Sequence, residues 1–367
     1  MRWQAPRLSL LIALVCVAGC MPPDGAHCRQ DDKVGQASQA DGSAVEVAQG
    51  LAAVHVFTEG YLELWAQSPV LHLSYEVGAR APATLRVRVR NIPADAVLWP
   101  FAAAEPVLRL PGTRPTVGEW LLPVSPGQRL ELEVAPPDGA AAGDFAFGVL
   151  SDIQEALDRF GDFAEPLEAE AGLRFVISTG DLARNGTAAS FRAVQAALEA
   201  LPVPFYSTIG NHDLPGVVPH WGDIFGRTSF HFRFKGVAFS LLDTATASLD
   251  GCVYEALQGW LAASRGGLHV VAMHIPPFDP VGTRSGAFRS RREGLRLLNT
   301  LGAAGVDMTF YGHLHTAMFF ANGGIPAWIS GGGGAIEERM DGIGRHYLRV
   351  DVGGVPRDLQ VAIRRIE

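Results

Sequence analysis

Hydrophobic and polar residues alternate with a period of two along residues 51–135. Short runs of this kind stand between Gly, Pro, Asn or Ser turns, and they read AVHVFT, YLELWA, VLHLSYE, TLRVRVR, PVLRL and RLELEV. A period of two turns alternate side chains to opposite faces of a strand, and short strands at close spacing are typical of a β-sandwich. The pattern therefore predicts a small all-β sandwich domain at 51–135, of an immunoglobulin-like or fibronectin-like kind.

The pattern changes after the turn-rich stretch APPDGAAAGD at 135–144. Apolar runs then alternate with segments in which apolar residues recur every three or four positions, and this predicts an α/β fold with helices on both faces of a sheet. The second domain is expected at 144–367. Expected strands are 145–151, 174–179, 205–210, 237–243, 269–274 and 307–312, followed by PAWISG, HYLRVDV and LQVAIRRI; expected helices are 153–161, 187–200, 253–264 and 291–303.

The first 20 residues have the pattern of an export signal. Arg2 and Arg7 precede an apolar stretch at 8–18 that is too short to span a bilayer. The stretch ends in VAGC, which resembles a bacterial lipobox and implies a signal peptide at 1–20 and a lipid on Cys20. An ordinary signal peptide with a chance cysteine is the alternative. The residue after Cys20 is not aspartate, which favours the outer membrane, facing the periplasm.

Residues 21–50 are small, polar and without a period, so we expect a flexible tether there. Cys16 leaves with the signal peptide, which makes Cys28 and Cys252 the remaining cysteines besides Cys20. An oxidising compartment would allow these two to pair. The sequence alone leaves their pairing open.

The composition agrees with a chain that folds into two domains and excludes several other classes. Of the 367 residues, 48% are hydrophobic and 19% are charged, which excludes a disordered protein. The formal net charge is -8, and no long run of Lys or Arg occurs. We therefore expect no nucleic-acid partner.

Polar residues directly follow several of the expected strands. The carboxyl ends of strands converge on the ligand crevice of an α/β sheet. Each motif alone is common in turns or in a core, but their order and placement together point to a metal site. Two divalent cations about 3.5–4 Å apart need a bridging carboxylate and several oxygen or imidazole ligands. The residues are Asp152, Gly180-Asp181, Gly210-Asn211-His212-Asp213, His274 and Gly312-His313-Leu314-His315.

These motifs resemble those of the calcineurin-like metallophosphoesterases, which read D-x-H, G-D, G-N-H-[D/E], a lone H and G-H-x-H. The resemblance covers about residues 145–350. It implies an α/β fold in which a metallophosphoesterase β-sandwich is flanked by helices. It also implies hydrolysis of phosphoric esters at a dinuclear metal centre, with a metal-bridging hydroxide as nucleophile.

The resemblance also assigns roles to individual residues. Asp181 would bridge both metal ions, and His212 would protonate the leaving oxygen, with Asp213 as its orienting partner. Asp152, position 154 and His315 would complete the first metal site. The second site would be completed by Asn211, His274 and His313.

Gln154 departs from the family pattern, which has His at this position. A neutral amide oxygen is a harder ligand than imidazole and shifts the preference toward Mn or Mg. The variant resembles manganese-dependent ADP-ribose/CDP-alcohol diphosphatases. The prediction is therefore a pair of divalent ions, with Mn as the preferred metal and Fe, Zn or Mg as the alternatives. The alternative is that Gln154 points away and the first ion is bound loosely or not at all.

Further polar residues are candidates for contact with a small phosphoester substrate. Arg184 and Asn185 follow Asp181, and Arg284 and Arg289 lie in a Gly/Ser-rich loop beyond His274. Phosphomonoesterase, cyclic-nucleotide phosphodiesterase and nucleotide pyrophosphatase activities all stay open. A rival from another class is a binding lipoprotein that kept the fold and lost turnover.

Overall fold

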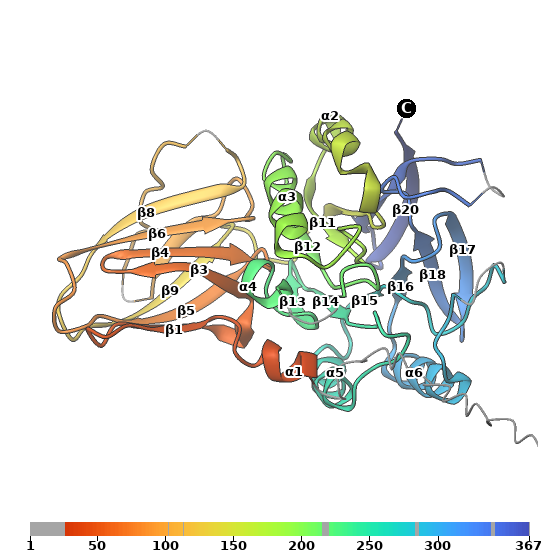
Figure 1. The fold of residues 1–367 in the computed structure, drawn as a ribbon, viewed down its shortest axis with the longest axis horizontal. Coiled ribbons are helices and arrows are strands. Elements are labelled where there is room, and N and C mark those ends of the chain that lie inside the picture. Colours follow the sequence, from red (N-terminus) through yellow and green to blue (C-terminus); the bar gives the residue numbers. More distant parts are fainter. Residues whose placement is uncertain are drawn as a thin grey trace, which may run out of the picture.

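Four β-sheets form the framework of the fold, two in the amino-terminal part and two in the rest. The computed structural model describes residues 26–101, 103–112, 114–214, 220–282, 286–338 and 342–366. The signal peptide and Cys20 lie outside these residues, and so does Arg284. Figure 1 shows the first two sheets side by side with the larger α/β part.

The amino-terminal part is all-β, as the period of two predicts. The first sheet has the order β1 (Gln36–Ser38), β2 (Ala44–Val47), β5 (Leu71–Glu76), β9 (Arg129–Ala135), β7 (Val97–Pro100). The second has the order β3 (Ala52–Thr58), β4 (Tyr61–Ala66), β6 (Thr84–Arg90), β8 (Val117–Pro123), with β4 and β6 parallel. Both sheets contribute inward-facing residues such as Leu64, Leu73, Val87 and Leu132 to one buried cluster.

Two details of this part differ from the prediction. The run PVLRL forms only a bridge between Val107 and Leu98, and Leu108 within it is 86% exposed. The flanking strand positions are instead taken by β7 and β8, which were not predicted.

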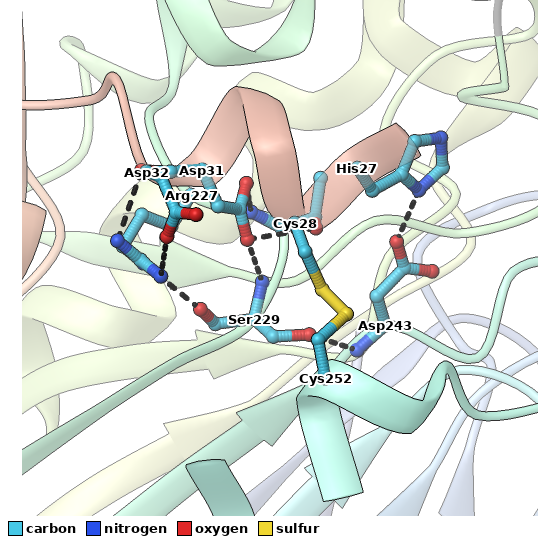
Figure 2. The surroundings of a disulfide bond; sticks show 9 residues. His27, Cys28, Asp31, Asp32, Arg227, Ser229, Asp243 and Cys252 are labelled. Atoms are coloured by element: carbon cyan, nitrogen blue, oxygen red, sulfur yellow. Dashed lines mark hydrogen bonds and ion pairs between the residues drawn. A yellow bond between two sulfur atoms is a disulfide. The ribbon is translucent and has the colours of Figure 1, made fainter. Parts of the chain in front are cut away.

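Residues 26–50 are also ordered, whereas the sequence predicted a flexible tether over 21–50. They form helix α1 (Ala26–Asp31), strands β1 and β2 and the 3-10 turn η1 (Ala48–Gly50). A disulfide joins Cys28 of α1 to Cys252 of α5. Figure 2 shows how His27 contacts Asp243 while Asp31 accepts a hydrogen bond from Ser229. Asp31 also accepts the N–H of Thr228, and these contacts fasten α1 to the α/β part.

The α/β part consists of two further sheets packed face to face. One has the order β12 (Phe205–Ser207), β11 (Leu173–Ser178), β10 (Phe145–Val149), β19 (His346–Gly353), β20 (Asp358–Arg365). The other has the order β13 (Phe230–Phe234), β14 (Val237–Leu242), β15 (His269–Met273), β16 (Met308–Tyr311), β18 (Ile325–Ser330), β17 (Ala317–Asn322). Between them, the ring of Phe147 meets those of Phe239 and Phe310 edge to face, at 5.1 and 6.1 Å between centroids.

Helices cover the outer face of each of these two sheets. The 3-10 helix η2 (Gln154–Phe163), α2 (Ala164–Ala169) and α3 (Ala188–Leu198) pack on the first, and α5 (Gly251–Ala263) and α6 (Arg291–Ala304) pack on the second. The short helix α4 (Trp221–Ile224) lies against β3 and α3. The architecture is thus a β-sandwich flanked by helices, which the family resemblance implied, and not a single sheet with helices on both faces.

Local sequence explains where these helices begin and end. Thr187 and Ser190 start α3, because the Thr187 hydroxyl accepts the Ser190 N–H at 3.2 Å. Ser290 caps α6 in the same way, and Gly305, with φ of +75°, ends it. Within the described part of the chain, every helix is too short or too polar to cross a lipid bilayer.

Candidate metal centre

The motif residues meet at the carboxyl ends of five strands, β10, β11, β12, β15 and β16. Asp152 follows β10 and Asp181 follows β11, and the segment 210–213 comes after β12. His274 directly follows β15, and His313 and His315 follow β16. The two packed sheets therefore bring together side chains that are as many as 163 positions apart in the chain.

The backbone at this site is held in an unusual conformation. The residues concerned are Asp152, Gln154, Asp181 and His313, which have φ angles of 62°, 44°, 54° and 67°. Left-handed backbone is sparsely populated by residues other than Gly and costs on the order of 1 kcal/mol each. The surrounding fold must therefore maintain these four conformations, which turn the side chains toward one place.

Glycine at 210 is required by close approach of two loops. A Cβ at Gly210 would overlap the backbone N and the carboxylate of Asp181. The Gly-Asn-His motif can therefore lie directly against the Gly-Asp turn only because position 210 lacks a side chain.

One group of side chains surrounds His274. The ligand atoms of Asp181, His274 and His313 all lie within 4.8 Å of one another. Nε2 of His274 is 3.3 Å from Oδ2 of Asp181 and 2.9 Å from Oδ1 of Asn211. On the other side of the ring, Nδ1 is 3.1 Å from the Thr179 carbonyl oxygen, which fixes the orientation of the imidazole.

A second group surrounds the carboxylate of Asp152. Nε2 of His315 lies 3.4 Å from Oδ1 of Asp152, and its Nδ1 contacts the carbonyl oxygen of Ile336 at 2.5 Å. The amide of Gln154 lies between the two groups, with Nε2 at 2.8 Å from Oδ2 of Asp181 and 3.5 Å from Nε2 of His315. The side chain of Gln154 therefore points into the site and not away from it.

The donor set fits a pair of divalent cations. Oδ1 of Asp152 is buried and accepts no hydrogen bond among the described residues, whereas Oδ2 accepts the N–H of His313 at 3.1 Å. Asp181 faces both groups, since its Oδ2 lies near His274 and Gln154. A buried carboxylate oxygen without a hydrogen-bond donor, beside the imidazole of His315, is what a bound cation would satisfy.

Protonation supports this interpretation. Burial would lower the pKa of His274, but the carboxylate of Asp181 outweighs it and raises the pKa to about 9. Burial would raise the pKa of Asp152, but His315 and His274 outweigh it and lower the pKa to about 2. Without a cation, His274 thus holds a proton among carboxylates, and a metal ion would take the place of that positive charge.

His212 is exposed at the edge of the site, whereas Asp213 is buried beneath it among backbone N–H groups. The backbone N–H of His212 donates to Oδ1 of Asp181 at 2.8 Å, and its exposed ring has Nδ1 at 3.4 Å from the carbonyl oxygen of Arg184. The buried carboxylate of Asp213 accepts the backbone N–H groups of Leu182, Ala183 and Gly210 at 3.2, 2.9 and 3.0 Å.

These contacts change the role expected for Asp213. The prediction made it the orienting partner of His212, whereas in the structure it joins the Gly-Asp turn to the Gly-Asn-His loop. The ring of His212 is instead oriented by a backbone carbonyl. Burial, with a contribution from Asp181, raises the pKa of Asp213 to about 7, although the three N–H groups act in the opposite direction.

The other predicted substrate contacts are placed as follows. Arg184 is exposed, with Nε at 3.8 Å from Oε1 of Glu155. Oδ1 of Asn185 accepts the hydroxyls of Thr187 and Ser190 at 3.0 and 2.7 Å, so this side chain supports the start of α3. Arg289 lies just before α6, and its backbone N–H donates to the carbonyl oxygen of Ala247.

Sequence reasoning missed the groups that hold the histidines in place. They are the carbonyl oxygens of Thr179, Ile336 and Arg184, which face His274, His315 and His212. These are backbone atoms that every residue type carries, so no side-chain pattern could have indicated them.

Part of the chain matches a known protein family in sequence. Residues 145–317 match the sequence model of a family described as calcineurin-like phosphoesterase. No curated protein matches the chain.

Several solved structures have a similar arrangement of elements. The structure of PhoD aligns with a TM-score of 0.47 at 12% identity, covering 81% of this chain and 88% of that chain. A dimetal phosphatase from Danio rerio aligns with 0.46 at 13% identity, covering 61% and 99%. GAP50, described as the anchor in the inner membrane complex of Plasmodium, aligns with 0.43 at 16% identity, covering 61% and 89%. At these values the likenesses carry no functional argument.

Proposed function

Residues 145–317 belong to the calcineurin-like phosphoesterase family. We propose that this chain hydrolyses phosphoesters and that the reaction takes place at a pair of divalent metal ions. The observation that carries the proposal is the position of Asp181. Its carboxylate faces both His274 and Gln154, at 3.3 and 2.8 Å, so that one residue lies between the two groups of donors.

We assign the donors to two ions that share Asp181. When bound, the ions would polarise the phosphoryl group and supply a bridging hydroxide as nucleophile. The set contains only two carboxylates, so two divalent ions would leave surplus positive charge for an anionic ester. The first ion would be held by Asp152, Gln154 and His315, and the second by Asn211, His274 and His313.

His212 is the residue we assign to proton transfer. Its backbone N–H donates to Oδ1 of Asp181, so the residue lies next to the carboxylate that the two ions would share, and its ring is exposed. If Nδ1–H donates to the Arg184 carbonyl oxygen, Nε2 is left to give a proton to the leaving oxygen. Arg184 and Arg289 are the described candidates whose guanidinium groups could contact the substrate.

Gln154 supports manganese as the first choice. Half a turn of its amide would present Oε1 where Nε2 now lies, and a neutral oxygen ligand favours Mn or Mg over Zn. Fe and Zn complete the set of candidate ions. Replacement of Gln154 by His tests this assignment directly, because imidazole is the softer donor.

We also propose that the protein is exported and lipid-anchored through Cys20, at the outer membrane and facing the periplasm. The lipobox-like sequence at 17–20 is the first support. The disulfide between Cys28 and Cys252 is the second, because disulfides persist in oxidising compartments. A Cys20→Ser variant that still partitions with membranes after detergent-free extraction would contradict the anchor.

The substrate class is tested with a panel assayed at saturating Mn²⁺. A phosphomonoester, bis-p-nitrophenyl phosphate, a cyclic nucleotide and a nucleotide diphosphate ester together cover the open activities. Hydrolysis of at least one ester that disappears in Asp181→Asn is the expected result. Failure on every ester at full metal occupancy would refute the enzyme proposal and favour a binding lipoprotein.

A further inference from the structure

Asn91, at the end of β6 in the all-β part, makes a two-point contact with a strand of the α/β part. Its Nδ2 donates to the carbonyl oxygen of Phe205 at 2.8 Å, and its Oδ1 accepts the N–H of Phe205 at 2.8 Å. The side chain is buried, and Nδ2 also donates to the Ala66 carbonyl oxygen. Phe205 begins β12, which is an edge strand, so the amide of Asn91 supplies pairing that a further strand would otherwise give.

Gln67 makes a second contact of the same kind. Its Nε2 donates to the carbonyl oxygen of Arg227 at 2.8 Å, and its Oε1 accepts the N–H of Arg227 at 2.6 Å. Gln67 is also buried and directly follows Ala66, to which Asn91 is bonded. A Cβ at Gly226 would overlap the Gln67 amide, so the backbone there has closed tightly around it.

Both contacts lead to the loop that carries Asn211 and His212. Phe205 is the first residue of the strand that runs into this loop. Arg227 precedes Thr228, whose carbonyl oxygen accepts the buried hydroxyl of Thr208 at 2.7 Å. Thr208 stands three residues before Asn211, so the two amides act on the same segment at two points, directly at Phe205 and through Thr228 at Thr208.

The packing around these contacts is continuous between the two parts. Trp65 of β4 is buried in one cluster with Phe205, Ile209 and Phe225, and its ring lies edge-on to Phe225 at 6.2 Å. An interface that shares a buried apolar core leaves little room for relative motion of the two parts.

From these contacts we propose that Asn91 and Gln67 are positioning residues of the metal centre, and that the all-β part is a fixed component of the catalytic scaffold. The two amides hold the segment 205–213 in the register that brings Asn211 to His274 and His212 to Asp181. The inference rests on the proposed metal-dependent hydrolysis. Its structural half, the fixing of 205–213, is measurable without that premise.

The test uses variants that remove each amide with little other change. Asn91 has a φ of 64°, so Asn91→Gly removes the side chain while suiting the left-handed backbone. Gln67→Met keeps the length of the side chain and removes both polar atoms. The matched control is Leu73→Ala, on the other sheet of the all-β part, which weakens packing without touching either contact.

Three quantities are measured on the full folded chain. In both amide variants, hydrogen exchange of the peptide 205–214 is expected to rise about tenfold. The affinity for Mn²⁺, measured by titration calorimetry, is expected to fall about tenfold or more, which is the usual effect of losing a group that orients a metal ligand. The value of kcat is expected to fall by a similar factor, with little change in KM. Leu73→Ala is expected to lower the melting temperature and leave all three unchanged.

Each contrary result is decisive. Unchanged exchange in 205–214 overturns the inference, whatever the activity. Faster exchange with wild-type Mn²⁺ affinity and kcat shows that the amides order the segment without setting the ligands, and also overturns it. A wild-type protein that neither binds Mn²⁺ nor hydrolyses an ester refutes the proposed function separately, and with it the positioning role.

Discussion

Two buried histidines outside the metal centre should make the protein less stable in mild acid. His231 of β13 and His269 of β15 share the hydroxyl of Ser240 on β14, with Nδ1 of His231 at 3.0 Å and Nε2 of His269 at 2.8 Å from that oxygen. The ring of His231 also stacks on Trp260 of α5, at 5.6 Å between centroids. One hydroxyl between two imidazoles suits neutral rings.

Burial and nearby positive charge both lower the pKa values of these two histidines. Burial lowers the pKa of His231 to about 4, with further contributions from His269 and Arg233. Burial, followed by Arg233, also lowers the pKa of His269 to about 4. The unfolded chain has a histidine pKa of about 6.5. Between these values the unfolded state binds protons that the folded state does not, so stability falls as pH falls from about 6.5 to 4.

The size of the effect follows from the same two pKa values. At pH 5 each histidine favours the unfolded state by about 2 kcal/mol relative to pH 7.5. Asp31 and Asp213 have raised pKa values, about 6 and 7, and oppose this change in the same range. The informative quantity is therefore the difference between wild type and a variant, and not the total slope.

His269→Gln is the variant of choice, because its amide can still bond Ser240 but does not titrate. Urea unfolding of metal-free protein at pH 7.5 and pH 5.0 measures the free energy of unfolding in both chains. The variant should lose about 2 kcal/mol less than the wild type on going to pH 5.0. An equal loss in the two proteins would show that His269 is not held neutral by the fold, and the reasoning would be refuted.

Three further predictions concern the metal centre and the disulfide. Asp181→Asn and His313→Ala should each lower kcat at least about a thousandfold, because each removes a donor on which the ions depend; rates within tenfold of the wild type would contradict the ligand assignment. Gln154→His should raise the Zn to Mn ratio measured by elemental analysis of purified protein, and an unchanged ratio would show that Gln154 is not a ligand. Cys252→Ser should lower the free energy of unfolding by up to about 5 kcal/mol, since the bond closes a loop of more than 200 residues. Equal urea midpoints with and without the bond would contradict that expectation.

Much of the α/β part could be predicted because its central strands, such as β14 and β15, are buried along their whole length and its long helices are amphipathic. The segment 269–274 illustrates this, since HVVAM forms the fully buried strand β15 and His274 stands at its end. The position of a chemical group at a strand end follows from such a pattern. The contacts of that group cannot be predicted in this way. Asp213, for example, accepts hydrogen bonds from backbone N–H groups of a turn about 30 positions away.

The amino-terminal segment shows a second limit. Residues 26–50 lack an apolar period, and this composition predicted an unstructured tether. Their order comes from partners far along the chain: Cys28 bonds Cys252, and Asp31 accepts hydrogen bonds from Thr228 and Ser229. Contacts between residues some 200 positions apart leave no local pattern from which they could be predicted.

The ordered segment also determines the length of the linker between a lipid on Cys20 and the folded enzyme. A tether of 30 residues could extend about 100 Å, whereas Cys20 is only six residues from Ala26, a reach of at most about 21 Å. Because α1 is fastened to α5 by the disulfide, a lipid on Cys20 would hold the catalytic part itself close above the bilayer. An anchored enzyme of this kind would sample the layer of solution next to the membrane, where phosphoesters released from or embedded in that surface are most concentrated.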